Sequence, residues 1–389
     1  MYVRSAGCYR CQEPTNLAGC AGEVSGASLI FYFLTRTDWD EPPRIRHQLA
    51  KMLLRQGHEV IFFERPRKSG SFPPHQPQLG LTCVRVTEAL HHQLRPVALL
   101  QRLSGWCARQ RIEAAIEKYS LPRPDVVVNF NYDYEFAKEL FPESRLILFL
   151  NDDFVGMARS WMRHEAERVE AACARDADVV LTVSSGIASR YEGVAGVETE
   201  LFLPWAESSY EAPAKAVARN TVLYFGYINS RNDWPLIREL VESSSMNFRF
   251  VGEAGDRVSA ESMRALSTRS NVEHLGAMAF EKVSLDDVCC SIAPYDMSVE
   301  GAAAITLNNR SLRLLSRGIP SVITEMPHLL PSACRVVRPA TDAAGFQEAI
   351  EDFHREFFEI QGEIEAFVEE NGEAARYRRL IELSTARSD

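Results

Sequence analysis

The sequence predicts an α/β fold made of two doubly wound, Rossmann-like domains that face each other across a cleft. Short apolar runs alternate with helical patterns in the first half of the chain, and the same alternation restarts after a polar linker. At about 100–200 residues per domain, a chain of 389 residues has room for two domains. Strands that alternate with helices form parallel sheets, which bind ligands at the carboxyl ends of their strands.

The first predicted domain, residues 28–205, opens with a strand–helix–strand unit. The run 28–34 (SLIFYFL) is a short apolar strand, and apolar residues over 45–53 recur at helical spacing. Gly57 stands where a glycine ends a helix, before a second apolar strand over 59–64. Further strands are expected at 81–87, 125–130, 145–150, 178–184 and 200–205, and helices at 99–119, 135–140, 162–174 and 186–191.

The segment 206–219 is polar, rich in small residues and contains a proline, so it is predicted to be the linker. A second domain is expected over 220–345, and helices that pack back on the first domain over 346–389. The strands of this half are expected at 221–226, 247–252, 271–276, 290–295 and 321–324, and its helices at 234–242, 259–266, 280–289, 309–317, 344–359 and 363–384.

Residues 1–27 are expected to form a disordered leader, because they contain no apolar run. Cys8, Cys11 and Cys20 could be part of a zinc site, but no nearby histidine supplies a fourth ligand. An odd total of nine cysteines without regular spacing argues against a disulfide framework. No apolar run is long enough to span a bilayer, so a cytoplasmic location is expected.

The charge balance excludes a general nucleic-acid-binding surface. Lys and Arg number 43 against 53 Asp and Glu, for a formal net charge of −10, whereas phosphate backbones require a basic surface. The stretch from Arg36 to Lys68 is locally basic and includes Trp39. Such a helix could rest on an anionic membrane, or its charges could form an ordinary solvated face.

Several common α/β chemistries are disfavoured by missing motifs. Neither half has Gly-x-Gly-x-x-Gly after its first strand, so a dinucleotide cofactor is not expected. The chain also lacks a Walker A motif, a Gly-x-Ser-x-Gly elbow and a His-Glu-x-x-His pair. No cofactor is therefore predicted.

The order of motifs resembles that of GT-B fold glycosyltransferases of the family 4-like kind. The segments YFGYINSRND, NFRFVGEAG and NVEHLG match the glycine-ended strands of their donor-binding half. NNRSLRLLSRGIPSV resembles their helix pattern Pro-Asn-Lys-x-x-Glu-Tyr-Leu-Ala-x-Gly-x-Pro-Val. In the first half, TDWDEPPRIRHQLAKMLLRQGHEVIFFE and LFLNDDFVGM resemble bacterial envelope-polysaccharide and teichuronic-acid-type members.

This resemblance implies a glycosyltransferase that works in cell-envelope or exopolysaccharide biosynthesis. The second domain would bind a nucleotide-diphosphate sugar donor and the first a saccharide or lipid-linked acceptor, without a metal. The chain departs from the family pattern at Arg313, where relatives carry a glutamate. A sugar-nucleotide epimerase of the same fold and a non-catalytic sugar- or partner-binding protein are the alternatives.

The donor site is expected around Asn309 and Arg310, which stand at the Asn-Lys pair of the family pattern. They open a helix, whose N-terminal N–H groups favour a phosphate, and the forked guanidinium of Arg310 suits a diphosphate. The loops at the same edge of the sheet add further candidates for the nucleotide. These are Gly226, Tyr227, Arg231 and Glu300.

If the transfer inverts the anomeric configuration, which the sequence leaves open, a general base for the acceptor hydroxyl is expected at the carboxyl end of a strand in the first domain. Asp152 and Asp153 directly follow the strand 145–150, and either could be that base or a helix cap. Asp38, in the loop after the first strand, is the second choice. The triplet Asp38-Trp39-Asp40 also mimics a metal-binding Asp-x-Asp, but no metal site is predicted there.

Overall fold

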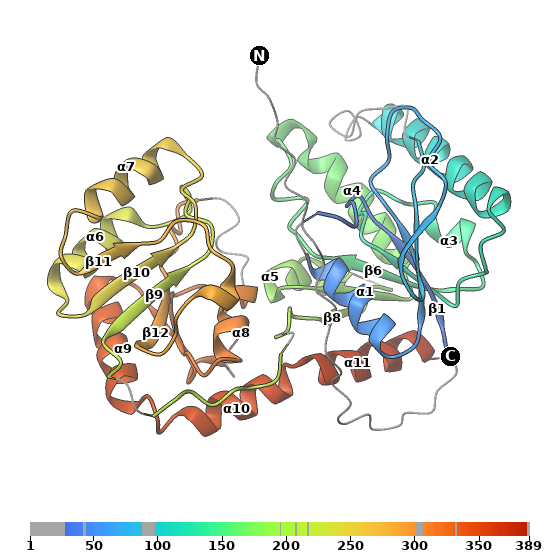
Figure 1. Ribbon diagram of the computed structural model, residues 1–389. Coiled ribbons are helices and arrows are strands. Elements are labelled where there is room, and N and C mark those ends of the chain that lie inside the picture. Colours follow the sequence, from blue (N-terminus) through green and yellow to red (C-terminus); the bar gives the residue numbers. More distant parts are fainter. Residues whose placement is uncertain are drawn as a thin grey trace, which may run out of the picture.

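The computed structural model divides the protein into two α/β domains, joined by a linker and by the C-terminal helices (Figure 1). The structure describes residues 28–41, 44–87, 98–194, 196–206, 208–215, 218–299, 306–330 and 333–386. The predicted leader 1–27 with Cys8, Cys11 and Cys20 lies outside the described residues, and so does Glu300.

The first domain is built on an eight-stranded sheet of order β3-β4-β2-β1-β5-β6-β7-β8, in which only β3 runs antiparallel to its neighbour. The chain moves outward from β1 to β2 and returns to β5, so the topological switch point lies between β1 and β5. Its strands are β1 (Ile30–Leu34), β2 (Glu59–Phe63), β3 (His75–Gln78), β4 (Leu81–Val84), β5 (Val126–Asn129), β6 (Arg145–Leu150), β7 (Val179–Thr182) and β8 (Thr199–Leu201).

Helices cover both faces of this sheet, which is why its strands are apolar on both sides. Successive residues of a strand point to opposite faces. Phe31 and Phe33 accordingly pack in one core with Leu49 and Leu53 of α1, whereas Tyr32 packs in the other core with residues of α2. The helices are α1 (Ile45–Arg55), α2 (Ala98–Lys118), α3 (Ala137–Leu140), α4 (Arg163–Asp176) and α5 (Ser185–Ala188), with short 3-10 turns at Ser160–Met162 and Ser189–Tyr191.

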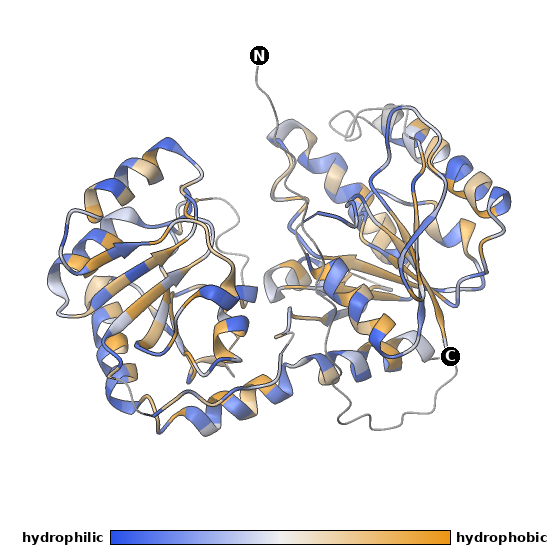
Figure 2. Cartoon of the chain, viewed as in Figure 1, coloured by the Kyte–Doolittle hydropathy of each residue, from blue (hydrophilic) through white to orange (hydrophobic). Residues whose placement is uncertain are grey.

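The second domain has a six-stranded, fully parallel sheet of order β11-β10-β9-β12-β13-β14, with its switch point between β9 and β12. Apolar strands fill the inside of both domains, while the outer faces of the helices are polar (Figure 2). The elements are β9 (Thr221–Phe225), α6 (Trp234–Ser243), β10 (Asn247–Val251), α7 (Arg257–Leu266), β11 (Val272–His274), β12 (Val288–Ala293), α8 (Asn309–Leu315), β13 (Ser321–Thr324), β14 (Val337–Ala340) and α9 (Ala343–Glu356).

The prediction of a helix over 280–289 is wrong. The chain makes only a 3-10 turn at Phe280–Lys282, and β12 begins at Val288. Asp287 explains the difference, because its carboxylate accepts hydrogen bonds from Thr221 and from the guanidinium of Arg249. These bonds fix the turn at 286–287, from which the chain enters β12.

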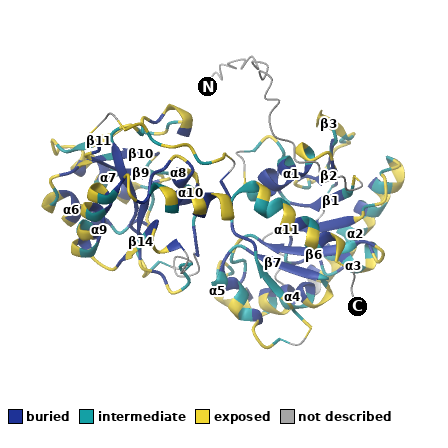
Figure 3. Ribbon diagram, turned by 90° about the horizontal axis from the view of Figure 1, so that it is seen from below, coloured by how far each residue is buried: buried dark blue, intermediate teal, exposed yellow. Residues whose placement is uncertain are grey.

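Two C-terminal helices, α10 (Gln361–Glu370) and α11 (Glu373–Thr385), replace the single helix expected over 363–384. Gly372 separates them, and a Cβ atom there would lie 2.9 Å from the carbonyl oxygen of Val368. Seen from below, α10 passes from the second domain toward the first and α11 lies under the first domain (Figure 3). There Leu380 is fully buried in the core that α1 also covers.

Within the described residues, no helix has both the length and the apolar character that crossing a bilayer requires.

Candidate active site between the two domains

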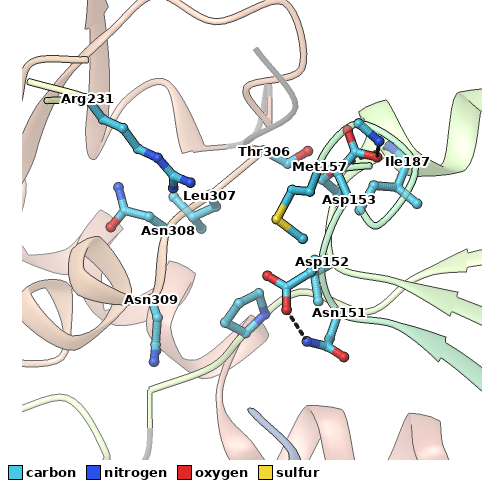
Figure 4. A pocket seen from close by; sticks show the side chains of 14 residues that line it. Asn151, Asp152, Asp153, Met157, Ile187, Arg231, Thr306, Leu307, Asn308 and Asn309 are labelled. Atoms are coloured by element: carbon cyan, nitrogen blue, oxygen red, sulfur yellow. Dashed lines mark hydrogen bonds between the residues drawn. The ribbon is translucent and has the colours of Figure 1, made fainter. Parts of the chain in front are cut away.

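A cavity of about 410 Å³ lies between the domains, at the edge where the carboxyl ends of their strands meet. From the first domain it is lined by the loop after β6 and by the start of α5; from the second, by Arg231 and by the segment before α8 (Figure 4). Ligands of doubly wound sheets bind at this edge, so the cavity is the candidate active site.

Two carboxylates of the first domain, Asp152 and Asp153, line this cavity, and Asp152 projects into it (Figure 4). Asn151 orients Asp152 by donating a hydrogen bond from Nδ2 to its Oδ2 at 2.6 Å. Burial raises the pKa of Asp152 above the usual range of an aspartate, and positive charges, that of Arg46 foremost, oppose the rise. A raised pKa moves a carboxylate toward the basicity that proton abstraction requires.

Asp153, the next residue, is held by its own loop and by a neighbouring ion pair. Its Oδ1 accepts a hydrogen bond from the amide of Gly156 at 2.9 Å and forms an ion pair with Arg190. Arg190 also pairs with the buried Glu170 at 3.0 Å, and Glu170 in turn accepts the hydroxyl of Tyr191. The structure therefore separates two aspartates that the sequence left equivalent. Both line the cavity, but Asp153 is tied into an ion-pair network, whereas Asp152 has no ion-pair partner among the described residues.

Asp38, the second choice for the base, is not one of the residues that line the cavity. Its carboxylate is almost fully buried and pairs with Arg67 at 2.8 Å and Arg85 at 3.0 Å. Its backbone oxygen contacts Nε2 of His47, whose ring packs against those of Trp39 and Phe62. Two guanidinium groups already occupy this carboxylate, so it is not placed to take a proton from an acceptor in the cavity.

The basic stretch from Arg36 to Lys68 is tied into the domain rather than gathered on one open face. Arg55 pairs with Glu373 of α11, and Arg65 pairs with Glu41. Trp39 is only partly exposed, with its ring centroid 5.3 Å from that of Phe62. These contacts give no support to the idea that this helix rests on a membrane.

Two residues of the second domain face Asp152 across the cavity. Arg231, in the loop after β9, extends its guanidinium toward the space, and in the described part of the chain that group has no hydrogen-bond or ion-pair partner (Figure 4). Asn309 lies on the same wall. Asn308 caps α8 by accepting the amide of Ser311 at 2.7 Å, which leaves its buried Nδ2 without an acceptor.

The helix pattern predicts that Arg310 binds the donor diphosphate, but in the structure its guanidinium is bound by groups of the second domain outside the cavity. Its guanidinium donates to the hydroxyl of Tyr295 at 2.8 Å and to the hydroxyl of Tyr224 and the carbonyl of Phe225, both at 3.3 Å. Because these contacts direct it beneath the end of β9, Arg310 does not line the cavity. Gly226, directly above, has a φ of +131°, and a Cβ there would meet the side chain of Arg310 at 2.5 Å.

The remaining donor candidates lie around the cavity rather than in it. Tyr227 is exposed, and its ring lies so close over Gly255 that a Cβ there would be 1.9 Å from its hydroxyl. Arg313, at the position of the family glutamate, pairs with Glu281 and lies 4.4 Å from the ring centroid of Phe280. Glu300 lies outside the described residues.

A hydrogen-bonded contact joins the two domains beside the cavity, which the sequence did not suggest. Oγ1 of Thr306 accepts the backbone N–H of Ser185 at 2.8 Å and bonds its hydroxyl at 3.0 Å. The hydroxyl of Ser185 also donates to the carbonyl of His328 at 3.3 Å. Ser185 starts α5 of the first domain, so these bonds fix the separation of the two cavity walls.

A cluster of three possible metal ligands lies at the far edge of the first sheet. Ligand atoms of Glu64, His75 and Cys83 lie within 4.8 Å of one another. Glu64 is already engaged, since it accepts the amide of Trp39 and pairs with Arg85. Burial raises the pKa of Cys83 to about 12, so its thiol stays protonated and is a poor metal ligand.

No protein-family model and no curated protein matches this chain, but solved structures do. Sucrose-phosphate synthase from Thermosynechococcus elongatus is 12% identical with a TM-score of 0.67, over 91% of this chain and 98% of that one. HepE from Anabaena, solved with UDP and glucose, is 12% identical with a TM-score of 0.62, over 92% and 100%.

The lipopolysaccharide outer core galactosyltransferase WaaB is likewise 12% identical, with a TM-score of 0.63, over 91% of this chain and 99% of that one. The fold that this chain shares with all three is the two-domain GT-B fold of glycosyltransferases. The likeness extends over nearly the whole of both chains in each case, so it includes both domains.

Proposed function

We propose that the protein is a glycosyltransferase that moves a sugar from a nucleotide-diphosphate sugar to a hydroxyl of a saccharide or lipid-linked acceptor. The observation that carries the proposal is the pair of opposed groups in the cavity. Asp152 of the first domain and Arg231 of the second project into the same space (Figure 4). The resemblance of the first half to envelope-polysaccharide enzymes supports a role in assembling a cell-surface polysaccharide.

In this proposal the second domain holds the donor. Arg231 contacts the diphosphate and stabilises the negative charge that develops as the nucleotide leaves, without a metal ion. Arg310 acts indirectly: it supports the loop that begins at Gly226, which carries Arg231 at its other end. The unused amide of Asn308 and the side chain of Asn309 are placed to bind donor hydroxyls or phosphate oxygens.

Asp152 acts as the general base on the acceptor. It removes the proton of the acceptor hydroxyl while that oxygen bonds to the anomeric carbon of the donor sugar. The bond between this carbon and the diphosphate oxygen breaks, and its electron pair leaves with the nucleoside diphosphate. The raised pKa of Asp152 and its position in the cavity fit this role, whereas the carboxylates of Asp153 and Asp38 are held in ion pairs with arginines.

The experiment is thermal unfolding with UDP, GDP, dTDP, ADP or CMP, in Mg²⁺ and in EDTA. A ligand that binds only the folded chain at 100 times its Kd stabilises it by about 2.7 kcal/mol. One nucleoside diphosphate should raise the Tm equally in both buffers. Arg231→Ala should remove the shift, and the matched control Arg257→Ala, which removes an exposed arginine at the start of α7, should keep it. No shift with any nucleotide would contradict the proposal.

A further inference from the structure

Trp106, in the first half of α2, is an exposed aromatic residue on the first domain. Its side chain is 61% exposed, although tryptophan is among the more buried residues of folded proteins. The ring borders a cavity of about 240 Å³ between α2 and α3, which lie side by side on the outer part of the domain (Figure 1). This cavity shares no lining residue with the candidate active site, so it is a separate site.

Polar groups that line this cavity can each take a further hydrogen bond. Gln101 is 4% exposed, and its Nε2 donates to Oε2 of Glu135 at 2.8 Å, whereas its buried Oε1 has no donor among the described residues. Arg109 donates from Nη1 to Glu139, and its Nε is buried without an acceptor in the same part of the chain. Unpaired buried polar atoms are costly, so a ligand with hydroxyl groups, which both donate and accept, would be favoured here.

The charges of the cavity do not favour an anion or a cation. Its lining includes three carboxylates and two guanidinium groups, from Asp133, Glu135, Glu139, Arg102 and Arg109. Arg109 pairs with Glu139, and Arg168 of α4 pairs with Glu135 at 3.4 Å. An anionic headgroup would need an excess of positive charge, which this lining lacks, and a cation would meet two arginines. The near balance of charge favours a neutral ligand.

An exposed indole beside hydrogen-bonding groups suits a neutral sugar ring. The face of an aromatic ring carries partial negative charge, and it attracts the weakly positive C–H groups on the flat side of a sugar. The hydroxyls at the edge of the sugar then reach the neighbouring polar groups. A purely apolar ligand could cover Trp106 but would leave Gln101 and Arg109 unpaired. The cavity therefore combines an aromatic surface with a few polar groups, as small-molecule sites do.

The start of α4 connects this cavity to the candidate active site. The loop after β6 carries Asp152 and Met157 in the wall of the active-site cavity. Trp161 follows in the turn before α4 and is 66% exposed. Two turns further on, Arg168 of α4 reaches Glu135 in the lining of the second cavity. One continuous segment of the first domain therefore links the two cavities and carries a second exposed tryptophan.

We propose that the cavity at Trp106 is a second saccharide-binding site, which holds a sugar unit of the acceptor away from its reacting end. The inference rests on the proposed function where it identifies this saccharide with the acceptor. It makes the acceptor a chain of several sugars, because a single sugar cannot occupy two separate cavities. The sugar unit stacks on the indole of Trp106 and bonds to Gln101 and Arg109, and this binding needs no nucleotide.

The test is calorimetric titration of the full chain with four neutral hexasaccharides, maltohexaose, cellohexaose, laminarihexaose and chitohexaose, in the absence of nucleotide. They differ in linkage or in the sugar itself, and all of them present flat ring faces and hydroxyl groups. At least one should bind, and glycerol at the same concentration of hydroxyl groups should not. If none of the four hexasaccharides binds the wild-type chain, the proposal is overturned.

Trp106→Ala should weaken the binding of the active hexasaccharide by at least about tenfold, because it removes the stacking surface. Trp106→Phe keeps an aromatic face and should lose less. The matched control is Leu103→Ala, which removes another exposed apolar side chain from the same helix but does not touch the cavity lining. It should bind within about twofold of wild type. Equal affinities of Trp106→Ala and wild type would overturn the proposal.

Anionic vesicles test a bilayer as the other possible occupant of this surface. Exposed tryptophan and leucine side chains on one helix also occur at membrane interfaces. Wild type should not sediment with vesicles of phosphatidylglycerol and phosphatidylcholine through Trp106. Sedimentation that Trp106→Ala abolishes and Leu103→Ala weakens, without binding of any hexasaccharide, would overturn the proposal in favour of a membrane contact.

Nucleotide titrations separate this inference from the proposed function. Trp106→Ala should keep the nucleotide affinity of the wild type, because the two cavities share no residue. If a hexasaccharide binds through Trp106 but no nucleotide binds, the transferase proposal fails and the saccharide site stands. If nucleotides bind and hexasaccharide affinity is the same with and without Trp106, only the second site fails. In turnover, Trp106→Ala should raise the KM of a hexasaccharide acceptor and leave kcat unchanged.

Discussion

The guanidinium of Arg310 lies directly beneath Gly226, so close that any side chain on Gly226 would displace it. A Cβ at this glycine would be 2.5 Å from both Cδ and Nη1 of Arg310. The residues are far apart in sequence, and the helix containing Arg310 follows β12, next to β9 in the sheet. The end of β9 and the start of α8 therefore form one unit, and the loop carrying Arg231 is built on it.

We expect Gly226→Ala to weaken nucleotide binding. The substitution adds both a clash with Arg310 and a strained backbone, since the φ of +131° is one that alanine rarely adopts. We expect a loss of about 1–3 kcal/mol in the free energy of unfolding, measured by urea denaturation, together with a calorimetrically measured loss of nucleotide affinity.

Gly276→Ala is the matched control for that variant. Gly276 has a positive φ of +66°, but no atom lies within 4 Å of its Cβ position, so the substitution introduces strain without a clash. It should lower stability and leave nucleotide affinity unchanged. Equal effects of the two variants on affinity would mean that the contact between Gly226 and Arg310 does not support the site.

Asp152→Asn should abolish sugar transfer while it stabilises the fold at neutral pH. Burial raises the pKa of Asp152, which means that the folded state disfavours its ionised form. The neutral asparagine removes that cost together with the base. Steady-state kinetics and urea denaturation at pH 7 measure the two effects. A variant with full turnover would exclude Asp152 as the base.

The pH dependence of transfer should reflect the ionisation of Asp152. The base must be ionised, so kcat/KM should fall as the pH falls through the raised pKa of Asp152. This acid limb should therefore begin at a higher pH than it would for an ordinary aspartate. Any transfer that remains in Asp152→Asn should lack the limb. If the variant keeps it, another group is responsible.

Asp153→Asn should have the opposite profile, with lower stability and much of the activity retained. It breaks the ion pair with Arg190, whose side chain is 27% exposed, and leaves Glu170 as the only carboxylate bound to that guanidinium in the described chain. The expected loss is about 1–2 kcal/mol. Glu143→Gln, which breaks a fully solvated pair with Arg123, should cost less than about 0.5 kcal/mol. Equal losses would show that the Asp153 network is no stronger than a surface pair.

Thr306→Val should loosen the contact between the domains. Valine has nearly the same shape but cannot accept the N–H of Ser185. The radius of gyration from small-angle X-ray scattering should increase in the variant. Thr268→Val, at the exposed end of α7, should leave it unchanged. An unchanged radius in Thr306→Val would show that this hydrogen bond does not hold the domains together.

The strand pattern could be read from the sequence because parallel strands buried on both faces are continuous apolar runs, as in RLILFL of β6. The strand β3 could not be predicted, because its four residues HQPQ are polar and all exposed. The helix expected over 280–289 failed for a related reason: long-range bonds from Asp287 to Thr221 and Arg249 override a local pattern.

In the site, the sequence placed Asp152 and Arg231 at the correct edge, since both follow strands of parallel sheets. It could not separate Asp152 from Asp153, because the separation depends on Arg190, 37 residues further along the chain. Arg46 is buried, which was not predicted although a signal existed. It stands three residues before Leu49 and seven before Leu53, which places a charge on the buried stripe of α1.

The central claim, that this cavity transfers sugar from a nucleotide donor, is tested most directly by turnover. The wild-type chain is incubated with each nucleotide sugar whose diphosphate raises its Tm and with a panel of saccharide and lipid-linked acceptors. The release of nucleoside diphosphate and the formation of glycosylated product are followed by mass spectrometry. We predict stoichiometric release and product with wild type, and neither with Asp152→Asn although that variant still binds the nucleotide. Tight nucleotide binding without turnover on any acceptor, or full turnover by Asp152→Asn, would contradict the account.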